Sequence, residues 1–442
     1  MMTPCRLPIW RVRLVTGIVL SSLLAVAVAA ASAPLEAQVV GVWTTRRPLN
    51  SLRTEVGGAT LLGRVHVVGA FPGSTGGPGI HEAYDPVTDT WATLAPLPEH
   101  LNHVGAVVVG DKLYVVGGWT QNILPSATLY RYDPMSDQWT ILAPMPTARA
   151  SPATVAYHDR IYVIGGNTAN GGFGEIGVVE AYDIATNSWI QNLAPLPTPR
   201  DHAMYGMLGT RIHVVGGRAR DFGGAMTTHE AYSPAANSWI QRAPLPTGRS
   251  GGAATVFQGR LHVLGGEFGP GGTQDTHEAY DANTDSWASL PPMPSARHGL
   301  AVAAVGGTLF AASGGPTPGA SYGNKLEAYT PTSTCTPRPQ ITVRASLVGP
   351  GRLAAQIGST TPPHLPGNRL VRIQVTGVSN AAADVRSLID QRQPFTLELS
   401  DRPAALQVIV RRLTPGHFSA RLVVHDDCGS WPTFVGGGAA VP

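Results

Sequence analysis

The stretch Arg260-Leu-His-Val-Leu-Gly-Gly266, followed by His277-Glu-Ala-Tyr-Asp281 and then by Trp287, decides the fold of this 442-residue chain. It joins a β-rich run ending in paired glycines to a tyrosine and a tryptophan at fixed intervals. The pattern returns along the chain, and its tryptophans are Trp43, Trp91, Trp139, Trp189, Trp239 and Trp287. Their spacing of 48 to 50 residues indicates an array in which each repeat is one supersecondary unit.

One repeat, residues 103–139, predicts four antiparallel strands. An apolar run at 104–109 and a second run at 113–116 flank Gly110-Asp111, a dipeptide typical of a hairpin turn. A third strand ends near Tyr132, and Trp139 lies on the fourth. A four-stranded sheet cannot bury both faces alone, so we expect neighbouring sheets to stack with Trp and Tyr between them.

Two further positions of the repeat have structural meaning. Paired glycines end the second strand, where a side chain would be crowded; they are Gly117, Gly118, Gly165, Gly166, Gly216, Gly217, Gly265, Gly266, Gly314 and Gly315. An Asp or Asn two residues before the tryptophan favours a tight turn; these residues are Asp89, Asp137, Asn187, Asn237 and Asp285.

The paired glycines, the tyrosine and the tryptophan together resemble the kelch repeat over about residues 39–331. Two departures are Val68-Gly69-Ala70 in place of paired glycines, and Ser233 where other repeats have Asp. The resemblance implies an all-β, kelch-type β-propeller. It also implies that the loops between second and third strands, and those between blades, lie on one face around the central channel.

The two ends of the array predict how it closes. Tyr329-Thr-Pro331 begins a repeat that has no tryptophan, whereas Val39-Val-Gly-Val-Trp43 carries a tryptophan with no repeat before it. Five complete units and two complementary fragments make six. We therefore predict a six-bladed propeller over residues 34–334, closed by the N-terminal strand, which removes the exposed sheet edges.

The first 33 residues have the features of a signal peptide. Arg6, Arg11 and Arg13 precede an apolar run from Leu14 to about Ala31, and small residues follow at 29–33. An uncleaved membrane anchor is the alternative, since 18 apolar residues approach the length of a span. We expect export to the periplasm or the exterior. Without residues 1–33 the 28 basic and 28 acidic side chains balance, which argues against a nucleic-acid partner.

The repeat pattern stops before residues 335–442. Alternating apolar stretches there, such as 341–344 and 370–375, predict a small β-sandwich-like domain, with residues 436–442 as a flexible end. Cys335 and Cys428 are the only cysteines after residue 33. In an exported protein such a pair predicts a disulfide, with free thiols or a metal pair as alternatives.

Several short patterns suggest catalysis but have simpler explanations. His81-Glu82, His229-Glu230 and His277-Glu278 lack the second histidine of a zinc-protease motif and recur at equivalent places, which favours a structural role. Gly248–Gly252 and Gly319–Gly323 match Gly-x-Ser-x-Gly, but in loops rather than in a strand–turn–helix. Residues 34–334 contain no cysteine, which excludes a copper-radical oxidase, and the pattern indicates no metal or cofactor.

The loops around the channel are the candidate binding surface, because Arg and aromatic residues dominate binding hot spots. The residues predicted to bind are Trp119, Arg149, Arg200, Asp201, His202, Arg218, Arg220, Phe222, Arg249, Phe268, Arg297 and His298. The inter-blade arginines recur in five repeats, including Arg53, and an alternative is that they pair with the glutamates that precede each Tyr.

These observations predict a secreted binding protein that recognises a protein or glycan through its loop face. The alternative is an enzyme, because exported six-bladed kelch propellers also resemble the sialic-acid mutarotases. In that case Asp201, Glu175 or Glu267 would act as base beside Arg200 or Arg218. No constellation in the sequence singles out one of them.

Overall fold

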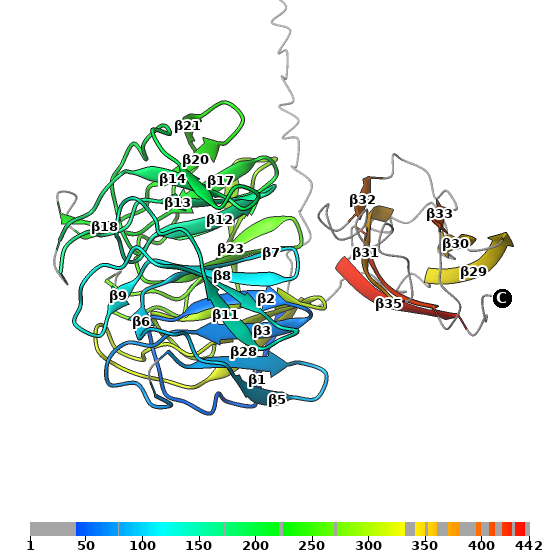
Figure 1. The fold of residues 1–442 in the computed structure, drawn as a ribbon, viewed down its shortest axis with the longest axis horizontal. Coiled ribbons are helices and arrows are strands. Elements are labelled where there is room, and N and C mark those ends of the chain that lie inside the picture. Colours follow the sequence, from blue (N-terminus) through cyan, green and yellow to red (C-terminus); the bar gives the residue numbers. More distant parts are fainter. Residues whose placement is uncertain are drawn as a thin grey trace, which may run out of the picture. The chain divides into compact units, whose positions relative to one another are not determined.

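The computed structural model describes residues 41–331, except 78, 171–172, 221–223 and 269–271, and seven strands within residues 341–437 (Figure 1). The predicted signal peptide, both cysteines of the predicted disulfide and Phe222 lie outside the described residues. In the described part the regular elements of three or more residues are all strands. No helix long and apolar enough to span a membrane occurs among those residues.

Residues 41–331 form six four-stranded antiparallel sheets, which confirms the predicted six-bladed propeller. Blades 1 to 3 are β2 (Gly57–Leu61), β3 (Arg64–Val68), β4 (His81–Asp85), β5 (Thr90–Leu94); β7 (Gly105–Val109), β8 (Lys112–Val116), β10 (Leu129–Asp133), β11 (Gln138–Ile141); and β12 (Ala153–Tyr157), β13 (Arg160–Ile164), β14 (Val179–Asp183), β15 (Ser188–Ile190).

Blades 4 to 6 are β16 (Met204–Leu208), β17 (Arg211–Val215), β20 (His229–Ser233), β21 (Ser238–Gln241); β22 (Ala253–Phe257), β23 (Arg260–Leu264), β24 (His277–Asp281), β25 (Ser286–Leu290); and β26 (Ala301–Val305), β27 (Thr308–Ala312), β28 (Leu326–Pro331), β1 (Gly41–Arg46). Two short ribbons, β6 (Leu101–Asn102) with β9 (Trp119–Thr120) and β18 (Arg218–Ala219) with β19 (Gly224–Ala225), join loops.

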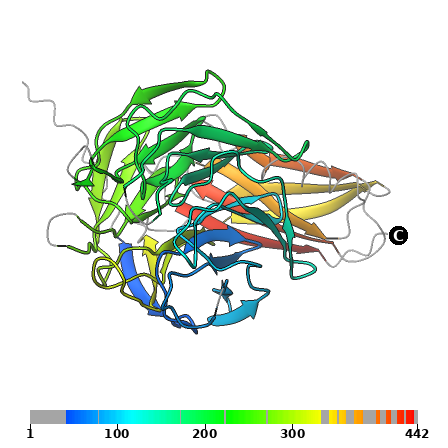
Figure 2. The same cartoon turned by 60° about the vertical axis from the view of Figure 1, so that its left-hand side comes forward.

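The N-terminal strand closes the ring, as the two ends of the array predict. β1 pairs with β28 as the outer strand of blade 6, with Trp43 opposite Tyr329. In Figure 2 the blue and yellow colours of the two ends of the propeller meet. The innermost strands contact one another in the cyclic order β2, β7, β12, β16, β22, β26 and back to β2.

The core of the propeller lies between blades. Buried apolar side chains form a cluster in each of the six gaps, for example Val65, Val67 and Tyr84 of blade 1 against Ala301 and Phe310 of blade 6. Burying this area supplies most of the driving force for stacking the sheets. The stability of each blade therefore depends on both of its neighbours.

The predicted turn and aromatic positions link each blade to the one before it in the chain. Oδ1 of Asp137 accepts hydrogen bonds from the hydroxyl of Tyr132 and from the amide of Ala95 in the preceding connection. Nε1 of Trp139 donates to the carbonyl of the same Ala95, 2.8 Å away. Trp139 and Asp137 thus both bond to the connection before blade 2, and Tyr132 holds Asp137 in place from within its own blade.

The paired glycines allow the end of each second strand to approach the backbone of the next inter-blade loop closely. The amide of Gly118 donates to the carbonyl of Arg149 in the next inter-blade loop, 2.9 Å away. A Cβ on Gly117, whose φ is 63°, would lie 2.5 Å from that same oxygen. Only glycine allows this approach without strain.

The described strands of the C-terminal part form two antiparallel sheets. One contains β29 (Ile341–Gly349), β30 (Arg352–Ser359) and β33 (Leu406–Arg411); the other contains β31 (Leu370–Ser379), β32 (Phe395–Glu398), β34 (Phe418–Asp426) and β35 (Gly429–Gly437). Gly436 and Gly437, predicted as part of a flexible end, pair with β34. The sandwich-like packing of the two sheets stays a prediction.

Candidate functional site

Six equivalent residues, one per blade, form a ring at the mouth of the central channel. Each stands two residues before an innermost strand, and the ring is Glu55, His103, Ser151, His202, Gly251 and Gly299. Their backbone groups are linked: the amides of His103 and Ser151 donate to Glu55 and His103, and those of Gly251 and Gly299 donate to His202 and Gly251. We call these six residues the axial ring.

All six residues of the axial ring have positive φ, between 50° and 62°. Glycine adopts this conformation freely, but Glu55, His103, Ser151 and His202 pay a steric cost for it. Residues held in such conformations cluster at functional sites, where the surrounding structure enforces them. Backbone hydrogen bonds join the six residues in two runs, Glu55–His103–Ser151 and His202–Gly251–Gly299.

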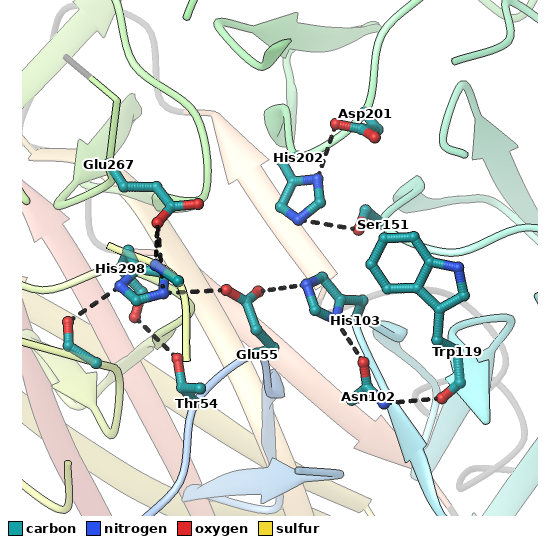
Figure 3. Close-up of polar contacts among 12 residues, drawn as sticks. Thr54, Glu55, Asn102, His103, Trp119, Ser151, Asp201, His202, Glu267 and His298 are labelled. Atoms are coloured by element: carbon teal, nitrogen blue, oxygen red, sulfur yellow. Dashed lines mark hydrogen bonds and ion pairs between the residues drawn. The ribbon is translucent and has the colours of Figure 1, made fainter. Parts of the chain in front are cut away.

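Glu55 lies at the centre of a cluster of histidines and carboxylates (Figure 3). One carboxylate oxygen is 3.2 Å from Nε2 of His103, and the other is 3.3 Å from Nε2 of His298. Nε2 of His298 is also 3.5 Å from a carboxylate oxygen of Glu267. His103 of blade 2 and His298 beside blade 6 thus contact Glu55 directly, and Glu267 of blade 5 joins the cluster through His298.

Burial decides the protonation of Glu55 and His103. Burial, followed by the charge of Glu267, raises the pKa of Glu55 to about 8. Burial and then the neighbouring His202 hold the pKa of His103 well below its usual value. At neutral pH a protonated Glu55 can therefore donate a hydrogen bond to the unprotonated Nε2 of His103.

Asp201, His202 and Arg218 form a second part of the cluster. Oδ1 of Asp201 is 2.8 Å from Nδ1 of His202 and 3.0 Å from Nε of Arg218. Burial alone would raise the pKa of Asp201, but the contacts with His202 and Arg218 outweigh it and lower that pKa to about 2. Asp201 is thus a buried carboxylate that holds two cationic or hydrogen-bonding partners in place.

The inter-blade arginines point into the blades rather than toward the channel. Each is buried and pairs with the glutamate before the tyrosine of its own blade; the pairs are Arg53–Glu82, Arg149–Glu180, Arg200–Glu230, Arg249–Glu278 and Arg297–Glu327. The structure thus has the arginine–glutamate pairs that the sequence offered as the alternative to ligand binding by these arginines. Because their guanidinium groups have almost no exposed surface, Arg149, Arg200, Arg249 and Arg297 are not available to a ligand on the loop face.

Other residues of the predicted surface divide between interior and exterior. Trp119 is buried, packs edge-on against His103 and donates from Nε1 to the carbonyl of Ala169. His202 and His298 are also buried, in the cluster around Glu55. Arg220 and Phe268 are exposed.

Two exposed phenylalanines lie beside one exposed and one half-buried arginine on the loops of blades 3, 4 and 5. Phe173 is 60% exposed with the guanidinium of Arg220 over its ring, and Phe268 is 51% exposed beside that of Arg218. Isolated bridges such as Asp201 with Arg218 tie these loops to the inter-blade loops. We call Phe173, Arg218, Arg220 and Phe268 the Phe–Arg patch.

Sequence reasoning missed Glu55, the central residue of the cluster. The predicted binding residues are mainly arginine and aromatic side chains, and the candidate bases are Asp201, Glu175 and Glu267, none of which is the glutamate two residues after Arg53. A signal was present, because the axial ring recurs with the repeat period of 48 to 51 residues. At this position one repeat has glutamate, two have histidine, one has serine and two have glycine.

Comparisons with known proteins place the repeats in a family. A family model described as the KLHDC2/KLHL20/DRC7 Kelch-repeats domain matches residues 83–330. Similar proteins include Kelch-like protein 15 of Danio rerio (33% identity over 20% of this chain and 14% of the relative), Beta-scruin of Limulus polyphemus (34%, 19% and 9%) and Kelch-like protein 4 of Homo sapiens (37%, 18% and 10%). The matched segments thus span 9% to 14% of these relatives' own length.

Proposed function

The chain belongs to the kelch-repeat family, and on that basis we propose that it is an exported protein that binds a protein partner through the loop face of its propeller. Kelch propellers are typically protein-interaction modules. The basic and apolar character of residues 1–33 supports export. The loop face is the side that carries the axial ring and the loops between the second and third strands of each blade.

The observation that carries the proposal is the Phe–Arg patch. Two phenylalanines more than half exposed offer apolar area, and the exposed Arg220 over Phe173 adds positive charge, whereas Arg218 beside Phe268 is paired with Asp201. Aromatic residues and arginine are enriched at the centres of protein interfaces. The patch comes from irregular loops of three successive blades, where sequence varies without disturbing the blade cores.

Sugar-acid isomerisation has no comparable support. Of the residues considered for it, Asp201 is bonded to Arg218, Glu267 lies against Arg218 and His298, and Arg200 is buried against Glu230. A free substrate carboxylate would have to displace these partners. We therefore favour binding over catalysis.

A display selection tests the proposal. The purified chain is panned against a random peptide library on phage and, in parallel, against a glycan array. We expect enrichment of peptides with acidic and apolar residues, lost in the variant Phe173→Ala/Arg220→Ala/Phe268→Ala.

The matched control is Val87→Ala/Met135→Ala, which removes exposed apolar side chains from the turns between third and fourth strands, at the opposite ends of the strands. This control should bind the same peptides as the wild type. Equal loss in both variants, or enrichment of glycans alone, would overturn the proposal.

A further inference from the structure

Three histidines of the cluster around Glu55, namely His103, His202 and His298, each direct Nε2 toward other side chains of that cluster. Nδ1 of His298 contacts the carbonyl of Gly315 at 3.1 Å, and Nδ1 of His202 contacts Asp201. Nδ1 of His103 contacts Oδ1 of Asn102, whose amide nitrogen donates to the carbonyl of Trp119. Each Nδ1 therefore faces an acceptor and carries the hydrogen, which leaves Nε2 as the free lone pair in the neutral ring.

His298 presents the unexplained contact. Its side chain is fully buried, and Nε2 makes no hydrogen bond although carboxylate oxygens of Glu55 and Glu267 lie 3.3 and 3.5 Å away. The oxygen of Glu55 that faces His298 is Oε1, not the Oε2 that contacts His103, so the lone pair of Nε2 and the two facing carboxylate oxygens are three acceptors with no donor between them. Buried polar atoms are rarely left in this way, and a cation held between the three atoms would satisfy all of them.

We propose that Glu55, Glu267 and His298 bind one divalent first-row transition-metal ion, such as zinc, at the mouth of the propeller channel. Two carboxylates and one neutral imidazole balance the charge of a divalent cation, and both ligand types suit zinc. Ligand atoms of a tetrahedral zinc site lie roughly 3.2–3.5 Å apart. The two measured contacts of His298 fall in that range, and all three ligand atoms lie within 4.8 Å of one another.

The surroundings of the three ligands are built to hold them. The Gly315 carbonyl orients His298, and the amide of Gly319 donates to Oε2 of Glu267 at 3.0 Å. Such outer contacts fix metal ligands in their productive orientation. The glycines are also required for space: a Cβ on Gly299 would lie 2.7 Å from Oε1 of Glu55, and one on Gly315 would lie 2.6 Å from Cε1 of His298.

Glu55 also belongs to a second group, with His103 and His202. That group is a poorer metal site, because Nη2 of the Arg218 guanidinium lies 3.4 Å from Nε2 of His202 and its positive charge opposes a cation there. Arg218 reaches only the far oxygen of Glu267, 3.7 Å away. The metal is therefore assigned to the side of Glu55 that faces His298.

Zinc titration of the full chain, purified without an affinity tag and stripped with chelator, tests the inference. Bound zinc is measured by mass spectrometry of the metal and by competition with a chromogenic chelator. We expect the wild-type chain to bind one zinc ion and to show a higher Tm with zinc than without it. Glu55→Gln and His298→Ala should lose both the bound zinc and this rise in Tm. His158→Ala, an exposed histidine outside the cluster, should bind as the wild type does.

X-ray absorption at the zinc edge of the wild-type chain provides a readout that needs no variant to fold. The assigned ligands predict one imidazole with the remaining ligands oxygen. Two imidazoles would move the ion to His103 and His202 and overturn the assignment. Failure of the wild type to retain zinc, or equal binding by Glu55→Gln, would overturn the site itself.

Discussion

Trp43 lies opposite Tyr329 in the antiparallel ladder between the first and the last strand of the propeller. The two rings pack 5.3 Å apart, and Nε1 of Trp43 donates to the carbonyl of Pro291 in the connection after blade 5. The strand that carries Trp43 thus completes blade 6, and the indole of Trp43 contacts the connection between blades 5 and 6. Ring closure depends on this strand because it supplies the outer edge that residues 301–331 lack.

Trp43→Ala should destabilise the propeller by about 3 kcal/mol, because it removes a large aromatic side chain that packs between blades 5 and 6. Urea unfolding measures the change in the free energy of unfolding. Val42→Ala is the control, since Val42 is half exposed and immediately precedes Trp43 in the same strand. Equal effects of the two substitutions would contradict the role of Trp43 in closure.

The buried ion pair of blade 5 can be exchanged for the residues of blade 2. Blade 2 has Leu101 and Tyr130 at the positions where blade 5 has Arg249 and Glu278, and all four are buried. Arg249→Leu alone should cost about 3–5 kcal/mol, because it leaves the carboxylate of Glu278 unpaired. Adding Glu278→Tyr should recover part of that loss. Urea unfolding of the single and double variants checks this, and a double variant no better than the single would show that the apolar pair does not fit blade 5.

Acid should destabilise the propeller through three buried histidine pairs, one in each of blades 1, 4 and 5. Nδ1 of His213 is 2.8 Å from Nε2 of His229, and the other pairs are His66–His81 and His262–His277. Burial, and for His213 also the neighbouring ring, lowers the pKa of His213 to about 3 and that of His229 to about 4. The unfolded chain binds protons near pH 6.5 and the folded chain does not, so stability is full above pH 6.5 and falls as the pH drops toward 4.

Blade 3 supplies the variant that tests this prediction, because it has Tyr162 and Val179 where blade 4 has His213 and His229. His213→Tyr with His229→Val should make the loss of unfolding free energy between pH 7 and 4.5 smaller, because one of the three pairs is removed, while His103 and His202, whose pKa values burial also lowers, remain. Chemical unfolding across this pH range measures the slope. An unchanged slope would assign the acid sensitivity to other groups.

Asn237 should stabilise the contact between blade 4 and the connection before it. Its Oδ1 accepts hydrogen bonds from the hydroxyl of Tyr232 and the amide of Ala194, both at 2.7 Å, and its φ is 46°. Asn237→Gly keeps the backbone conformation but loses both bonds, so a cost of about 1–2 kcal/mol is expected. Asn237→Asp keeps both acceptors, as Asp137 does in blade 2, and should unfold at nearly the wild-type Tm. Thermal unfolding compares the two, and similar losses would show that the accepted bonds contribute nothing.

The blades could be predicted from the sequence because their determinants are local. Paired glycines such as Gly117-Gly118, the turn residue Asp137 and the aromatic Trp139 each act within one repeat or on its neighbour. Closure by β1 could also be predicted, because Trp43 and Tyr329 are complementary fragments of one repeat. The repeat period, and which repeats are complete, can be read from the sequence without the tertiary structure.

The direction of each loop side chain was decided only by the tertiary structure. Arg249 and Arg220 are the same residue type on loops of the same face, yet one is buried against Glu278 and the other lies exposed over Phe173. The cluster of Glu55, Glu267 and His298 exists because closing the ring brings residues from different repeats to one axis. The local sequence pattern sets what each blade contains, whereas ring closure sets which side chains of different blades meet.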